Sequence, residues 1–292
     1  MKNAARLAFG LALLAGATYA LPPALAAQQN FDNVQIRAHQ VTGSVYYLEG
    51  QGGNIGLSVG EDGVVMIDDQ FAPLTDRILA AIRELNDGEI RFLINTHVHG
   101  DHTGGNENLG RMGILILARD EVRVRLAASE RPDEALPVLT FSDEITIHLN
   151  GEEVRTIPVP PAHTDGDSYI YFASSDVLHM GDVFRTNGFP YMDLANGGTL
   201  QGTIDALAVG IGMAGPNTRI IPGHGGVSTR EDVMAFRDMI LDVVARMRPM
   251  VARGMTYEQI AETNPTAAYA DRGWGDPERF LRGVYEELGG GM

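Results

Sequence analysis

A dense cluster of ionisable side chains at the end of one predicted strand constrains this chain more than any other feature. Residues 91–95 predict a buried strand. The strand is followed directly by Thr96-His97-Val98-His99-Gly100-Asp101-His102. Three imidazoles and a carboxylate buried without partners would be costly, so they need a common partner, for which a divalent metal is suited. Side chains two residues apart in an extended segment point the same way, so His97 and His99 can share one ion. Asp101 and His102 can then reach a second ion.

Two more histidines and one aspartate occur in comparable settings later in the chain. His163 and His224 each lie in a loop that follows a β-rich run, and Asp182 lies between them. Because strand ends can converge on one edge of a sandwich, we expect all seven groups to lie close together.

Strand and helix patterns divide the chain into two similar blocks. The first contains three β-rich runs that predict an antiparallel meander, at 45–48, 54–59 and 64–68. A helix is predicted at 74–85 and a loop at 96–106. The second block contains four β-rich runs, at 145–149, 154–159, 168–172 and 176–179, and helices at 200–213 and 230–253. Two such blocks predict an α/β fold with two sheets packed face to face and helices outside.

Composition limits the metals and the partners. The 292-residue chain has no cysteine, and its 22 basic and 38 acidic side chains give a formal charge of -16 at neutral pH. Without thiolates, any metal must be held by nitrogen and oxygen. Nucleic acids and anionic membrane surfaces are bound through clustered Lys and Arg, which this chain lacks. We therefore expect a small-molecule substrate, no nucleic acid and no membrane partner, and the sequence predicts no oligomeric state.

The N-terminus has the pattern of a secretory signal peptide. Within residues 1–27, two basic residues precede an apolar run from Leu7 to Ala20, and small residues follow at a cleavage-type site. A membrane anchor needs about 20 apolar residues, and Pro22 interrupts the run early. We therefore predict a periplasmic or secreted protein, in which residues 28–292 form a single domain with C-terminal helices from about residue 229.

The order of the motifs resembles a known family. His-x-His-x-Asp-His, a distant His-Thr-x-Gly, a Gly-Asp and a Gly-His are similar to the motifs of the metallo-β-lactamase superfamily, over roughly residues 40–250. The resemblance implies an αββα four-layer sandwich with a metal pair at one edge. It implies that the first zinc is bound by His97, His99 and His163, the second by Asp101, His102 and His224, and that Asp182 bridges them.

The ligand set and the resemblance together predict the chemistry. Imidazole and carboxylate ligands suit zinc, and also manganese or iron. Two Zn2+ ions per chain would share a water and hold it as a bridging hydroxide for attack on a carbonyl. Asp101 would also orient that hydroxide, which makes it the predicted catalytic residue. Two alternatives from other classes of function use the same ligands: an iron-dependent sulfur oxidoreductase and a metal-binding protein without catalysis.

Two substrate classes fit the predicted zinc-dependent hydrolase. An exported enzyme meets cell-wall antibiotics, so the leading prediction is that it opens the amide of β-lactams. However, Asp182 stands where many β-lactamases carry a cysteine, and here the chain looks more like the hydroxyacylglutathione hydrolases, also called glyoxalase II. The alternative is therefore a lactone or thioester hydrolase with the same dinuclear site.

Two residues are candidates for binding the substrate. Arg185 follows Asp182 by three residues, where many zinc β-lactamases have a lysine that binds the substrate carboxylate, and a guanidinium can bind it bidentately. Asn196 could face the carbonyl oxygen, as an asparagine does in those enzymes. The alternative interpretations are a surface ion pair for Arg185 and a turn residue for Asn196. The loop Gly50 to Gly53 corresponds to the β-lactamase flap, and its glycines predict mobility.

Overall fold

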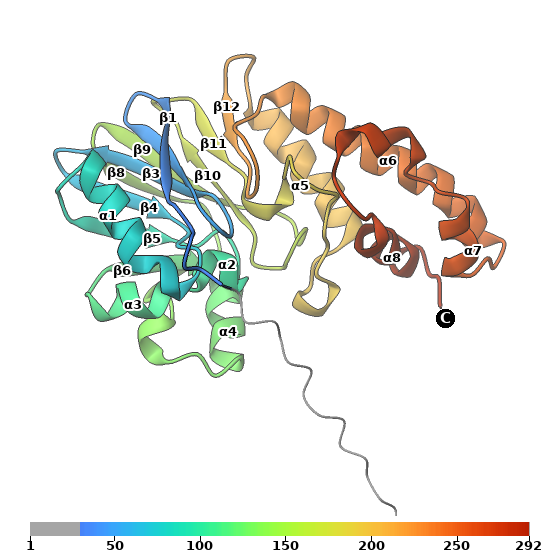
Figure 1. The fold of residues 1–292 in the computed structure, drawn as a ribbon, viewed down its shortest axis with the longest axis horizontal. Helices are drawn as coiled ribbons and strands as arrows, with labels where there is room; N and C mark the ends of the chain where they lie inside the picture. The colour runs from blue at the N-terminus through green and yellow to red at the C-terminus, as the bar shows by residue number, and fades with distance from the viewer. Residues whose placement is uncertain (1–29, 292) are drawn as a thin grey trace, which may run out of the picture. The chain divides into compact units, whose positions relative to one another are not determined.

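Two β-sheets form the centre of the computed structural model, which describes residues 30–291 (Figure 1). The first sheet has the strand order β1-β2-β3-β4-β5-β6-β7, and the second has the order β12-β11-β10-β9-β8. The predicted signal peptide, residues 1–27, lies outside the described residues. The strands are β1 (Arg37–Thr42), β2 (Val45–Glu49), β3 (Ile55–Gly60), β4 (Gly63–Ile67), β5 (Ile90–Ile94), β6 (Leu115–Arg119), β7 (Leu139–Phe141), β8 (Ile145–Leu149), β9 (Glu152–Pro158), β10 (Ser168–Phe172), β11 (Val177–His179) and β12 (Arg219–Ile221).

Alternation along the strands builds the layers between and outside the sheets. In β4, Val65 and Ile67 face the second sheet and pack in a cluster with Ile170 and Phe172 of β10. Val64 and Met66, which alternate with them along the strand, belong to a different cluster, on the outer face of the first sheet. Successive side chains of a strand point to opposite faces, so the apolar residues of β4 are buried on both faces of the first sheet. The outer face of a sheet with such strands must be covered by helices.

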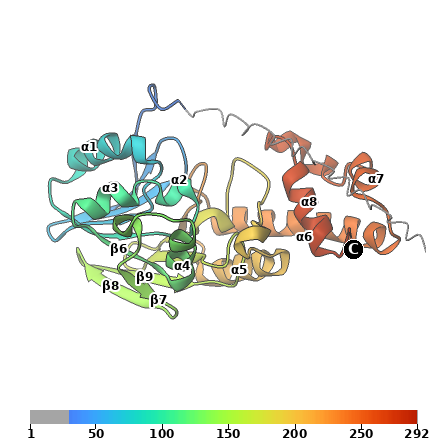
Figure 2. The same cartoon turned by 90° about the horizontal axis from the view of Figure 1, so that it is seen from below.

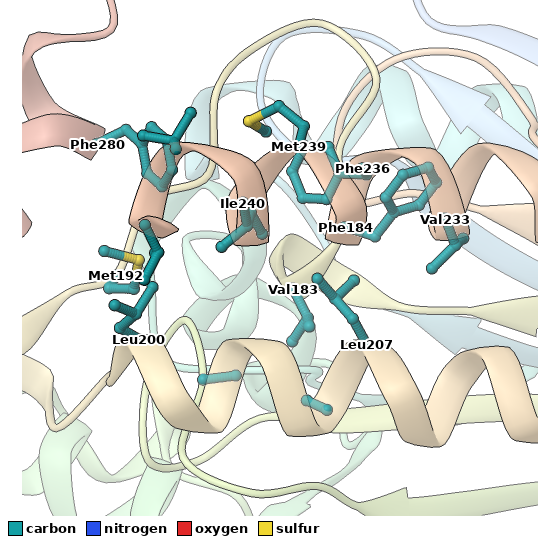
Figure 3. Packing of buried hydrophobic residues seen from close by; sticks show 14 of the residues in the cluster. Val183, Phe184, Met192, Leu200, Leu207, Val233, Phe236, Met239, Ile240 and Phe280 are labelled. Carbon is teal, nitrogen blue, oxygen red and sulfur yellow. The ribbon is translucent and has the colours of Figure 1, made fainter. Parts of the chain in front are cut away.

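Helices supply that cover. Ile78 and Ile82, one turn apart on α1, pack against the outer face of the first sheet together with Leu109 of α3. Helices α5 and α6 cover the outer face of the second sheet, where Leu207 and Ile240 lie in one cluster (Figure 3). The helices are α1 (Thr75–Leu85), α2 (Gly100–Thr103), α3 (Asn106–Arg111), α4 (Asp120–Ala128), α5 (Leu200–Met213), α6 (Arg230–Ala252), α7 (Tyr257–Glu262) and α8 (Glu278–Glu287).

This arrangement confirms the predicted αββα sandwich of the α/β class. The C-terminal helices continue the outer layer, because Phe280 and Val284 of α8 belong to the same cluster as α5 and α6. In both views α8 lies beside α6 (Figure 1 and Figure 2). Among residues 30–291, no helix has both the length and the apolar character needed to span a bilayer.

The predicted meander is confirmed, but the predicted loop at 96–106 is wrong. Strands β2, β3 and β4 pair antiparallel in sequence order. Residues Gly100–Thr103 form the short helix α2, and α3 begins at Asn106. This segment is polar and has no helical periodicity, so the sequence pattern gave no helix signal. Tertiary contacts hold it instead: the Asp69 carboxylate accepts a hydrogen bond from the Gly105 amide, and Asn106 pairs with Asn95.

The topology brings five strand ends to one edge of the sandwich. Strands β4 and β5 run parallel in the first sheet, and β11 and β12 run parallel in the second. Strand β10 is antiparallel to both of its neighbours, so the connection from β9 to β10 lies at the same end as the carboxyl end of β11. The loops after these strands carry the residues described next.

Candidate metal centre

The first ligand group consists of imidazoles from two loops. His97 and His99 follow β5, and His163 lies in the connection between β9 and β10. One ring nitrogen from each lies within 4.8 Å of the others, and Nε2 of His163 is 2.8 Å from Nδ1 of His99. The two-residue spacing puts the rings of His97 and His99 side by side, with centroids 4.9 Å apart. This is the trio expected at the first zinc.

The second group lies beside the first, and Asp182 faces both. Asp101, His102 and His224 also bring one ligand atom each within 4.8 Å of one another. Oδ2 of Asp101 is 3.2 Å from Nε2 of His224. Asp182, on a 3-10 turn after β11, has Oδ1 3.2 Å from Nε2 of His102 and Oδ2 3.2 Å from Nε2 of His224. Its Oδ2 also lies 3.7 Å from Nε2 of His163 in the first group.

Unpartnered atoms in these groups show that the residues fit metal ions. Nε2 of His97 is buried and has no hydrogen-bond partner in the described part of the chain. Nε2 of His102 and Oδ1 of Asp182 are also buried, and although they lie 3.2 Å apart, neither makes a hydrogen bond. Buried polar atoms are normally paired, so three such atoms at one place require an explanation. Neutral nitrogens and carboxylate oxygens are donors that Zn2+, Mn2+ and Fe2+ accept. Divalent cations would satisfy all three atoms.

The protonation states suit the same interpretation. Burial lowers the pKa of His97 well below its usual value and that of His163 to about 4, so both rings are neutral at neutral pH. Burial is the largest effect on His102 and His224 and opposes their charged forms, but the neighbouring carboxylates, Asp182 first among them, together outweigh it and raise the pKa of both rings. The protonated forms of these two rings are therefore favoured more than in a free imidazole. A metal ion entering the second group competes with protons there.

A buried aspartate that the sequence analysis missed connects the two groups from behind. Oδ2 of Asp68 lies 2.8 Å from Nδ1 of His102 and accepts a hydrogen bond from the Thr96 hydroxyl at 2.7 Å. The same hydroxyl is 3.0 Å from Nδ1 of His97. Hydrogen bonds at Nδ1 leave Nε2 of each ring free to bind metal and fix its direction. Asp68 thus orients one ligand of each group.

Two further acidic residues orient the rest of the first trio. Oδ2 of Asp193 lies 2.7 Å from Nε2 of His99, and the Tyr191 carbonyl lies 2.6 Å from Nδ1 of His163. Asp167 accepts a hydrogen bond from the backbone amide of His163 at 2.7 Å, which shapes the loop that carries it. The only sequence signal for Asp68 was its position after a buried strand. Asp193 and Asp167 lie in polar loops without a recognisable pattern.

Glycines let the backbone approach the ligands closely. A Cβ at Gly53 would collide with the His102 ring, and one at Gly223 would collide with Oδ1 of Asp182. The Gly50 to Gly53 loop is held by hydrogen bonds from the Gly53 amide to the Asp101 carbonyl and from the Gln70 side chain to the Gly53 carbonyl. In this chain Gly53 therefore serves close packing, and the mobility of the loop stays a prediction.

The two predicted substrate-binding residues have different positions. Arg185 lines a cavity of about 490 Å3, together with the ligands His99, Asp101, His163, Asp182 and His224. Asn196 does not line this cavity. Its amide donates to Asp193 at 2.7 Å, and its Oδ1 accepts from Arg125 at 3.0 Å. The structure thus gives Asn196 the role of a turn residue, because both ends of its side chain are occupied.

The family model described as the metallo-β-lactamase superfamily matches residues 48–225, which is more than half of the chain. The chain belongs to the metallo-β-lactamase superfamily. The resemblance predicted from the motifs is therefore confirmed, and the superfamily match contains all seven predicted metal ligands.

The similar proteins within the superfamily carry names of different activities. A hydroxyacylglutathione hydrolase of Nitrosococcus oceani is 30% identical over 158 residues, 52% of this chain and 55% of that protein. One from Rhodospirillum rubrum is 32% identical over 116 residues, 39% of this chain and 41% of that protein. The chain spans about half the length of these curated relatives. The solved metallo-β-lactamase from Pontibacter korlensis shares the fold, with a TM-score of 0.63 and 16% identity over 71% of this chain and 100% of that chain.

Replacing Asp68 tests whether the buried carboxylate orients the ligands. We expect Asp68→Asn to weaken zinc binding by about 10-fold to 100-fold, because the amide no longer accepts from both Thr96 and His102. Competition with a chelator of known affinity measures the effect. Asp242→Asn, on α6 outside the site, is the control and keeps the wild-type affinity. Unchanged zinc affinity in Asp68→Asn would contradict the role given to Asp68.

Zinc affinity should also depend on pH in a defined direction. The raised pKa values of His102 and His224 mean that these rings bind protons as the pH falls, and protons compete with the metal. We expect the affinity for the more weakly bound zinc to fall at least about tenfold between about pH 8 and about pH 6. Chelator competition at the two pH values measures it. Equal affinities would show that metal binding displaces no proton in this range.

Proposed function

We propose that this chain is a hydrolase that uses a pair of divalent metal ions, with Zn2+ as the metal. The observation that carries the proposal is the Asp182 carboxylate, whose two oxygens face the two ligand groups at 3.2 Å from His102 and from His224. Two divalent ions held there would supply Lewis acidity and lower the pKa of a water molecule toward neutrality. Membership of the superfamily supports the same chemistry.

Asp101 is the protein group best placed to orient the attacking water. Burial opposes its ionisation, but the neighbouring His102 and His224 lower the pKa of Asp101 to about 2, so it is a carboxylate at neutral pH. Its side chain is 26% exposed and lines the cavity, whereas that of Asp182 is 7% exposed. A carboxylate accepts a hydrogen bond from water and turns the oxygen lone pair toward the substrate.

Arg185 is the candidate for holding the substrate in place. It lines the cavity, and its Nε is buried without a hydrogen-bond partner in the described part of the chain. Among residues 30–291 Arg185 forms no ion pair, which argues against the alternative of a surface ion pair. A guanidinium with free donors binds a carboxylate well, so the substrate carries at least one acidic group.

Within this class we propose an acyl thioester as the substrate. The ligand set contains no thiolate, and two curated relatives are named hydroxyacylglutathione hydrolases. β-Lactams, the leading prediction from the motifs, are the second candidate. It is supported by Arg185 in the cavity and by the proposal that the chain is exported.

A substrate panel separates these candidates. The zinc-loaded protein is assayed with a hydroxyacylglutathione thioester, an acyl-homoserine lactone and a cephalosporin. We expect the thioester to have the highest kcat/KM. A cephalosporin preferred over both others would replace the thioester proposal by a β-lactamase. No hydrolysis of any compound would overturn the hydrolase, as would purification with iron and oxygen consumption with a persulfide substrate.

An Asp101→Ala variant is the control for the panel. Loss of the water-orienting carboxylate should reduce kcat at least about 100-fold. Circular dichroism should show the wild-type fold, because Asp101 is partly exposed and lies outside the hydrophobic clusters. Retained activity in Asp101→Ala would show that hydrolysis occurs somewhere other than at this site.

A further inference from the structure

Helix α8 contributes a cation to the cavity from outside the region that matches the superfamily model. The superfamily match ends at residue 225, and α8 spans Glu278–Glu287. Nevertheless Arg279 of α8 lines the same cavity as the metal ligands and Arg185. The next residue, Phe280, is buried in the same hydrophobic cluster as residues of α5 and α6, and this anchors the helix at that point (Figure 3).

Arg279 is held over an aromatic ring beside the first trio. Its guanidinium carbon lies 3.5 Å from the centroid of the Tyr191 ring. The Tyr191 ring in turn stacks on His99, with centroids 6.1 Å apart and an interplanar angle of 19°. Stacking uses the face of a guanidinium and leaves N–H donors in its plane for another acceptor. Arg279 is thus held in place while it still has donors to offer.

The carboxylates around the cavity are already engaged. Asp101 and Asp182 face the imidazoles of the second group, and Asp193 faces His99. Among residues 30–291, no carboxylate oxygen lies within 4 Å of Arg279. By contrast Arg282, on the same helix, lies 2.9 Å from Glu278. The positive charge of Arg279 can therefore pair with an anionic group of a bound ligand.

The two arginines are associated with different ligand groups of the metal centre. Arg185 is bridged through its backbone to His224, a ligand of the second group. Arg279 reaches the cavity through Tyr191, beside His99 of the first group. A substrate whose reacting bond lies over Asp182 would extend toward one arginine on each side. One acidic group can serve Arg185, and a second is needed for Arg279.

We propose that Arg279 is a specificity-determining residue that selects substrates with two anionic groups, one bound by Arg185 and the other by Arg279. The inference rests on the proposed function only in that this cavity binds the substrate. Arg279 does not touch the reacting bond, so it contributes to binding and leaves the chemistry unchanged. If Arg279 only stacked on Tyr191, it would hold α8 in place, but the protein would not prefer substrates with a second anionic group.

Binding of matched thiol ligands tests the proposal without any turnover. The full-length zinc-loaded protein is titrated with 3-mercaptopropionate, which has one carboxylate, and with mercaptosuccinate and 2-mercaptoglutarate, which have two. We expect the wild type to bind at least one dicarboxylate about tenfold more tightly than the monocarboxylate, as for a charge-assisted hydrogen-bonded pair. Arg279→Gln should abolish this preference and leave the Kd of 3-mercaptopropionate unchanged.

Control variants separate recognition from a structural role. Arg279→Lys should keep part of the preference, and Arg282→Gln should keep all of it. Equal binding of all the thiols by the wild type would overturn the proposal. So would an Arg279→Gln variant that weakens all of them alike or loses zinc, because these results indicate that Arg279 only positions Tyr191. If the wild type prefers the dicarboxylates but hydrolyses no compound of the substrate panel, the proposed hydrolase is refuted. The proposal that Arg279 recognises a second anionic group is then still supported.

Discussion

The site depends on one buried carboxylate shared between two groups of imidazoles. Burial alone would favour the neutral acid, yet the His102 and His224 rings keep the pKa of Asp182 well below its usual value. A charge in this position is stable only with positive partners close by, and with metal bound the cations take the place of the protons on these rings. The carboxylate therefore links the protonation of the second group to its metal binding.

The sandwich brings the positive partners of Asp182 to one place. The predicted metal ligands come from loops that are far apart in the sequence, and parallel strands in both sheets place these loops at one edge. Asp68 then fixes His102 and, through Thr96, His97. Glycines at 53 and 223 allow backbone to pass where any side chain would collide with a ligand. The C-terminal helices add Arg279 to this otherwise shared framework.

The sequence predicted the parts of this site that have a local pattern. Two-residue spacing and a position after a strand identified His97 and His99, and strand periodicity identified both sheets. Asp68 and Asp193 were missed because their roles depend on residues that are distant in the chain. Helix α2 was missed because tertiary hydrogen bonds rather than an apolar face hold that segment. Asn196 matched a motif loosely, and its neighbours Asp193 and Arg125 occupy its side chain instead.

The central claim is that Asp182 lies between two metal ions in one chain. Anomalous diffraction at the zinc absorption edge, from crystals of the zinc-loaded protein, tests it most directly. We expect two peaks per chain about 3.5 to 4 Å apart. One peak should lie against His97, His99 and His163, the other against Asp101, His102 and His224, with the Asp182 carboxylate facing both. A single peak, or a second peak away from Asp182, would contradict the account.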